Sequence, residues 1–412
     1  MTGAGATPAA PGSVWRFPGM PALGLVSVFG FSGYAALLSV APLWAARGGA
    51  DAVGSGLVNG VLLAATVLTQ LGVPALLRRF GHGPVIAAGV LLMGAASPAY
   101  LLSNALGSVL ALSAVRGVGF GIITVTGSAV VAHLVPAARR GAAVGAYGLA
   151  VAVPNLVLLP ASVTVADRWG FGWVFAVGAL PVVATPFAFA VARALGPADR
   201  VADGSPRRDR RTTRAVARPT AVLFAVTMAG GGLLTFAPQV VDPAGASWAL
   251  LVLGVGTATC RWGAGHLSDR HGAERFLAPL LLVGATGLGL CAWAAQRGGD
   301  LGLMLVGAAL AGVAYGGLQN LTLVVAFQQV DRAHIPVASA GWNIGFDGGT
   351  ATGAVTVGAI ATVSGFGAGF LALAVVCVAA LPLCRPARGR PATGGPAGGT
   401  TGPADEVADE VA

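Results

Sequence analysis

The residues with the clearest chemistry in this 412-residue chain are a few polar side chains inside long apolar stretches. Asp347 is the acid placed deepest in such a stretch, and Asn343 lies four residues earlier on the same helical face. Arg116 is the corresponding base in an earlier stretch. Charges are rare in apolar surroundings and usually face a cavity there, so these three are candidates for a proton-coupling group. The alternative is two buried charges satisfied by local hydrogen bonds.

The composition places these residues in a bilayer. Hydrophobic residues make up 55% of the chain and charged residues 9%, and apolar stretches long enough to cross a membrane recur from end to end. The net charge of +9 comes from arginines in short segments between those stretches, so we expect no nucleic-acid partner. The chain has no lysine, which excludes a phosphate-loop ATPase motif and a Schiff-base cofactor. We therefore expect no cofactor.

The apolar stretches divide the chain into two series of six. We expect an all-α membrane protein of twelve transmembrane helices in two six-helix bundles. The expected parts are a cytoplasmic segment 1–19, a bundle 20–194, a cytoplasmic linker 195–217, a second bundle 218–385 and a disordered cytoplasmic tail 386–412. Nineteen arginines fall on one side of this topology and three on the other, which predicts cytoplasmic termini and an inner (plasma) membrane location.

Two segments repeat at a spacing of about 190 residues. The sequence GVGFG at 117–121 matches GVAYG at 312–316, and RRFG at 78–81 matches DRHG at 269–272. An internal repeat of six helices suits a protein that alternates access to a site between two similar bundles.

One loop carries a specific signature. The segment GHLSDRHG at 265–272 resembles the GxLxDRxG signature of the major facilitator superfamily, and RGVGFG at 116–121 is similar to a fourth-helix motif found in many of its exporters. The resemblance covers about residues 20–385. It implies that Gly265, Asp269, Arg270 and Gly272 form a cytoplasmic gating loop.

The resemblance also implies that the first, fourth, seventh and tenth helices line a central cavity. The candidates there for contacts with a small-molecule substrate are Tyr34, Thr227, Tyr315, Gln319 and Asn320. Tyr315 and Gln319 share one helical face, whereas Asn320 points about 100° away and suits a packing role. Single polar residues in membrane helices often serve helix packing instead of ligand binding.

The expected function is therefore proton-coupled efflux of a small amphipathic organic molecule, a drug, sugar or metabolite, by a monomeric carrier. The alternatives are proton-coupled import of a sugar or organic acid, and a membrane sensor that transports nothing. We expect no enzymatic activity, because no acids, histidines or nucleophiles cluster at one interface. Four cysteines and five histidines lack metal-ligand spacing, so no metal site is expected.

Overall fold

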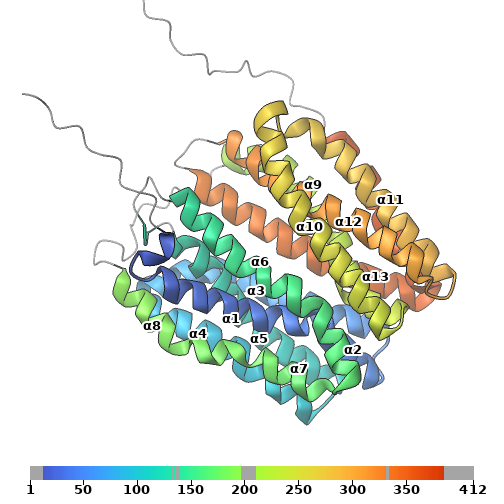
Figure 1. Ribbon diagram of the computed structural model, residues 1–412, viewed down its shortest axis with the longest axis horizontal. Helices are drawn as coiled ribbons and strands as arrows, with labels where there is room; N and C mark the ends of the chain where they lie inside the picture. Colours follow the sequence, from blue (N-terminus) through green and yellow to red (C-terminus); the bar gives the residue numbers. More distant parts are fainter. Residues whose placement is uncertain (1–12, 132, 136–139, 196–209, 331–333, 385–412) are drawn as a thin grey trace, which may run out of the picture.

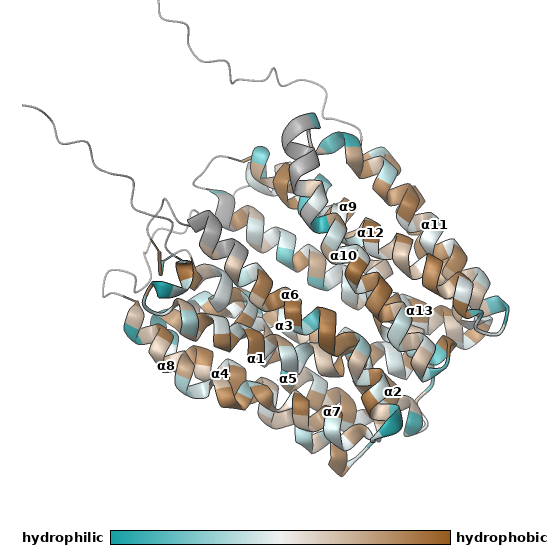
Figure 2. Cartoon of the chain, viewed as in Figure 1, coloured by the Kyte–Doolittle hydropathy of each residue, from teal (hydrophilic) through white to brown (hydrophobic). Residues whose placement is uncertain are grey.

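The computed structural model describes residues 13–131, 133–135, 140–195, 210–330 and 334–384. Helices dominate this part of the chain, and eleven of them are long and apolar enough to cross a membrane. Figure 2 shows that apolar residues run along most of each helix and that hydrophilic residues gather near the helix ends. The α-helices are α1 (Met20–Leu38), α2 (Val40–Arg47), α3 (Ala52–Phe80), α4 (His82–Ala99), α5 (Leu106–Val131), α6 (Arg140–Arg168), α7 (Phe171–Gly178), α8 (Thr185–Ala194), α9 (Arg210–Val240), α10 (Pro243–His271), α11 (Leu277–Gln296), α12 (Leu301–Gln328) and α13 (Ile335–Ala379).

Helix α13 contains two membrane crossings. Gly365 interrupts it with φ 79° and ψ 165°, a left-handed conformation that favours glycine. Beyond Gly365 the chain turns back, because Gly369 packs against Val357 and Cys377 lies at the carbonyl of Ala225. The eleven candidate spans therefore make twelve crossings, as the sequence predicts.

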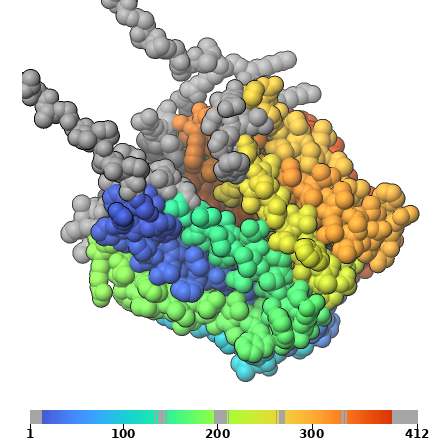
Figure 3. Space-filling model, in the orientation of Figure 1, coloured from blue at the N-terminus to red at the C-terminus, as the bar shows by residue number. Residues whose placement is uncertain are grey.

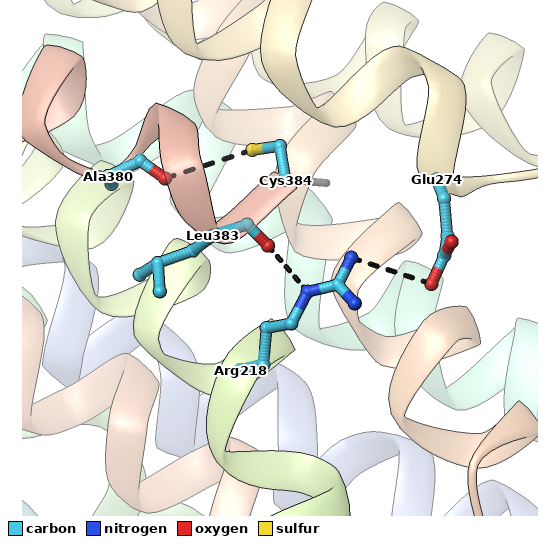
Figure 4. A network of polar contacts seen from close by, with 5 residues as sticks. All are labelled: Arg218, Glu274, Ala380, Leu383 and Cys384. Atoms are coloured by element: carbon cyan, nitrogen blue, oxygen red, sulfur yellow. Dashed lines mark hydrogen bonds and ion pairs between the residues drawn. The ribbon is translucent and has the colours of Figure 1, made fainter. Parts of the chain in front are cut away.

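The last described turn, Leu381–Cys384, packs on the first part of α9. Figure 4 shows Arg218 between the carbonyl oxygen of Leu383 and the carboxylate of Glu274. The Arg218 Nε donates to Leu383 at 2.5 Å, and its guanidinium lies 3.7 Å from Glu274. Helix α9 begins at Arg210, so the end of the expected linker is helical. Residues 196–209 of that linker, residues 1–12 and the tail beyond Cys384 lie outside the described residues.

Two helices occupy the centre. The most apolar windows of the spans Met20–Arg47 and Thr212–Val240 are each 83% buried, against 28% to 56% in the other spans. Figure 1 shows helices α1 to α8 together as one bundle and α9 to α13 as the second. On the face shown in Figure 3, the teal and green surface of α6 lies beside the yellow surface of α10. The hydroxyls of Thr164 and Ser247 meet there at 2.7 Å.

The two bundles repeat the same helix contact. A Cβ on Gly117 would lie 2.1 Å from the Leu62 carbonyl, and one on Gly312 would lie 2.3 Å from the Leu253 carbonyl, so only glycine permits either approach. One helical turn after each of these leucines, a threonine adds a hydrogen bond to the same contact. Thr66 Oγ1 donates to the Gly117 carbonyl at 3.0 Å, and Thr257 Oγ1 donates to the Gly312 carbonyl at 3.3 Å. Helices α3 and α5 therefore correspond to α10 and α12.

Aspartates begin α3, α10 and α12 at one end of the molecule, which we call the Asp51 face. Asp51 Oδ1 accepts from the Gly54 backbone at 2.7 Å, Asp242 Oδ2 accepts from Gly245 at 3.2 Å, and Asp300 Oδ1 accepts from Leu303 at 3.1 Å. A carboxylate at a helix N-terminus satisfies free N–H groups and the helix dipole. The opposite end, where α3 and α10 finish, is the His271 face.

Candidate substrate and proton site

A hydrogen bond between the two bundles reaches Asp347. This carboxylate is 5% exposed, and its Oδ2 accepts from Gln70 Nε2 at 2.8 Å. Gln70 lies on α3 and is 8% exposed. Nearer the Asp51 face, Asn59 on α3 also bridges the bundles by donating to Thr235 Oγ1 at 2.9 Å. Asp347 is therefore held at the bundle interface, about three helical turns of α3 away from that outer contact.

Glycines on α13 determine where Asp347 points. Gly345, Gly349 and Gly353 recur every four residues and press one face of α13 onto α9, where a Cβ on Gly353 would lie 2.0 Å from the Met228 carbonyl. Asp347 stands two residues from Gly345 and from Gly349, which is about 200° around the helix. Its side chain therefore projects away from α9 and toward α3.

Gln70 and Arg261 occupy corresponding positions in the repeat, each four residues after the threonine that contacts α5 or α12. Gln70 Nε2 also lies 3.3 Å from Thr124 Oγ1 on α5. Arg261 Nη1 donates to Gln319 Oε1 on α12 at 3.1 Å. Corresponding positions of the two bundles therefore hold a polar pair, Gln70 with Thr124 in the first bundle and Arg261 with Gln319 in the second. We call these positions the polar layer, and its second pair includes a cation.

Aromatic rings flank this layer. Tyr34 stacks on Phe120 with ring centroids 4.0 Å apart, and Tyr315 lies 6.0 Å from Phe346. Both tyrosines are buried and close enough to Asp347 for electrostatic interaction. The structure thus brings three predicted residues, Tyr34, Tyr315 and Asp347, to one region of the interface.

The partners expected for Asp347 are placed differently. Arg116 is 0% exposed, and its Nη2 donates to the Gly33 carbonyl on α1 at 2.7 Å. It forms no ion pair with Asp347 in this structure. Asn343 Nδ2 donates to the Ser339 carbonyl of its own helix at 2.9 Å, so Asn343 does not orient the carboxylate here. Gln70, and neither Arg116 nor Asn343, is the residue that contacts the Asp347 carboxylate.

Two of the cavity candidates serve helix packing. Thr227 is fully buried, where its Oγ1 donates to the Phe224 carbonyl at 3.1 Å and abuts Gly349 of α13. Asn320 Nδ2 donates to the Arg261 carbonyl at 2.7 Å. Gln319 is buried and faces Arg261, so the two neighbours on α12 hold Arg261 by its side chain and by its backbone.

The expected gating loop lies at the His271 face. Gly265, Asp269 and Arg270 belong to the last turns of α10, and their side chains lie outside the described residues. Gly272 follows the helix with φ 81°, which supports the tight turn expected of that glycine. Among the described residues, no group of His, Cys, Asp and Glu side chains is placed to hold a metal ion.

Two residues of this layer were not among the predicted site residues. Gln70 is one glutamine in an apolar helix, and Arg261 lies near the end of its span, where a loop role is the simpler interpretation. The available signal was the internal repeat, because its spacing of 191 residues equates positions 70 and 261. Only the structure shows that Gln70 reaches a carboxylate of the other bundle.

Twelve crossings in two corresponding bundles, with a buried carboxylate between them, define the class of polytopic carriers built from repeats. The sequence model of the Major Facilitator Superfamily matches residues 23–262 and, in a second match, residues 220–406. The chain belongs to the Major Facilitator Superfamily and is a membrane transporter of that type. Members of this superfamily bind small-molecule substrates and reside in a lipid bilayer.

The chain is also similar to a curated protein in sequence and to two solved structures in fold. A stretch of 118 residues is 32% identical to Rv1250, an uncharacterised MFS-type transporter of Mycobacterium tuberculosis, and covers 29% of this chain and 20% of that protein. A bacterial homologue of the human lysosomal transporter Spinster, in an inward-facing and occupied conformation, has a TM-score of 0.71 at 15% identity over 89% of this chain and 95% of its own. A POT family transporter in complex with 5-aminolevulinic acid has a TM-score of 0.72 at 12% identity over the same shares. At these identities the solved structures share the fold alone.

Proposed function

We propose that this transporter couples the movement of a small amphipathic organic molecule to protons through Asp347. The observation that carries the proposal is the Gln70–Asp347 hydrogen bond, because it joins the two bundles that must move in alternating access. The proton affinity of Asp347 then depends on whether the bundles hold Gln70 against it. The aromatic rings of Tyr34 and Tyr315 suit an amphipathic ligand. Gradient-driven uptake into proteoliposomes, compared between the wild-type chain and Asp347→Asn, tests the proposal.

The direction of transport follows from how the substrate and the proton affect each other. Efflux in exchange for protons, the mode expected from the sequence, requires the substrate and the proton to compete for Asp347. Such competition suits a neutral or cationic substrate.

Import together with protons requires the substrate and the proton to bind at the same time. Arg261 favours import, because a cation in the site attracts an organic acid. Labelled-substrate flux in proteoliposomes separates either carrier from a sensor that transports nothing.

The proposed setting is the plasma membrane, with a monomeric carrier and the His271 face in the cytoplasm. The prediction is that single cysteines at position 205 and at the exposed position 297, in a chain lacking its native cysteines, are labelled from opposite sides. Arginine placement is the physical reason, since positively charged loops stay inside. A membrane-impermeant maleimide should label position 297 in intact cells and position 205 only after lysis. Labelling of position 205 in intact cells would contradict this topology.

A gating role for Asp269 makes a separate prediction. Asp269→Asn should lower the turnover rate and leave the half-saturating substrate concentration within about twofold, because this loop is remote from the aromatic layer. Initial-rate flux measurements over a range of concentrations give both quantities. Glu274→Gln is the control, since Glu274 lies near the same face but contacts Arg218. Weakened binding with normal turnover in Asp269→Asn would assign this residue to the substrate site instead.

A further inference from the structure

Arg261 is a cation on α10 whose guanidinium faces α12. Arg261 is exposed although it lies on an apolar, membrane-spanning helix. Among the described residues its guanidinium makes one hydrogen bond, to Gln319, and it interacts electrostatically with Tyr315. A guanidinium carries five N–H donors in a planar fork, and the bond to Gln319 engages one of them.

The surrounding contacts hold Arg261 in place. Thr257, one turn earlier on α10, lies against Gly316 of α12, and its Oγ1 donates to the Gly312 carbonyl at 3.3 Å, so this face of α10 points at α12. Asn320 holds the Arg261 backbone carbonyl at 2.7 Å, and Gln319 holds the guanidinium at 3.1 Å. A donor group fixed in this way loses little conformational freedom when it binds a ligand.

Arg116, the other arginine inside a membrane-spanning helix, is closed off from a ligand. Arg116 is 0% exposed and is bonded to Gly33 inside the first bundle. Arg261 is exposed and neighbours Tyr315, a residue that also interacts with Asp347. Tyr315 therefore interacts with both the cation and the proposed proton carrier.

We propose that Arg261, supported by Gln319, binds a carboxylate or sulfonate group of the transported molecule, whose apolar part lies against Tyr315. The bidentate geometry of a guanidinium matches both anions. A bound anion repels the ionised form of Asp347, so it binds together with the proton. This inference rests on the proposed proton-coupled transport and selects proton-linked import of an organic acid over antiport.

The test is equilibrium binding to the purified protein in nanodiscs, with no gradient present. The probes are two matched pairs, benzenesulfonate with benzenesulfonamide and indole-3-acetate with indole-3-acetamide. We expect the wild-type chain to prefer the anion of at least one pair, and Arg261→Gln to bind that anion about tenfold more weakly or worse, because a charge-assisted hydrogen bond is lost. Arg261→Lys should keep a preference for the anion.

Two controls separate this inference from loss of folding and from the coupling proposal. Arg297→Gln removes an arginine that stacks on Trp293 at the Asp51 face and should bind like the wild type. Asp347→Asn should bind the anion at least as tightly, because it removes a repelling carboxylate. The inference is overturned if no anion binds, if the neutral amides bind equally well, or if Arg261→Gln keeps the preference with an unchanged melting temperature. If the wild-type chain prefers the anion in the binding measurement but shows no proton-coupled transport, only the coupling proposal is overturned.

Discussion

Asp347→Asn is expected to abolish proton-driven accumulation while leaving substrate exchange intact. Asparagine keeps the shape of the side chain and can still accept from Gln70 Nε2, but it carries no titrating proton. In proteoliposomes with an imposed inward proton gradient, the variant should reach only the equilibrium distribution of substrate, whereas the wild type should accumulate it. Counterflow, in which unlabelled substrate inside exchanges for labelled substrate outside, should continue at a similar rate.

Two comparisons make this result specific to the carboxylate. Asp347→Glu should retain some accumulation because it keeps a titrating group. Asp300→Asn replaces an acid that caps α12 at the Asp51 face and should couple normally. Accumulation by Asp347→Asn equal to that of the wild type, with the same dependence on the gradient, would show that Asp347 is structural.

Gly316→Ala is expected to destabilise the second bundle strongly. An added Cβ would lie 2.0 Å from the Thr257 carbonyl, so α10 and α12 would have to separate. Overpacking of this kind costs about 1–3 kcal/mol, more than the better helix propensity of alanine returns. The melting temperature of the purified protein should fall clearly.

The matched control is Gly289→Ala on α11, where an added Cβ would meet no atom within 4 Å. That variant should melt at the wild-type temperature or slightly above it. Because Gln319 lies on α12 just beyond Gly316, Gly316→Ala should also disturb the Arg261–Gln319 hydrogen bond and weaken anion binding. Equal melting temperatures for the two variants would contradict the close packing of α10 on α12.

The fold was largely predictable because the bilayer requires long apolar helices, and charges mark their ends. The helix boundaries follow the apolar stretches, and Gly365 divides the last hairpin as the two predicted spans require. The start of α9 at Arg210 was not predictable, since arginine-rich sequence suits both a linker and a helix that leaves the membrane.

The candidate site was predictable in part. Asp347 stands out because an acid is costly in an apolar helix, and the structure places Tyr34 and Tyr315 close to it. Its partner could not be inferred, because Arg116 donates to the Gly33 carbonyl inside its own bundle and forms no ion pair with Asp347. Contacts between bundles depend on how the two repeats dock, which periodicity along one helix does not encode.

Proton movement driven by the substrate alone tests the central claim most directly. Proteoliposomes containing the wild-type chain and an internal pH-sensitive dye receive external benzenesulfonate, which stays ionised and therefore cannot carry a proton across the lipid by itself. With the membrane potential clamped by potassium and valinomycin, proton-coupled import through Asp347 predicts that the interior acidifies with the wild type and stays constant with Asp347→Asn. Labelled benzenesulfonate entering the wild-type vesicles without any change in internal pH would contradict proton coupling.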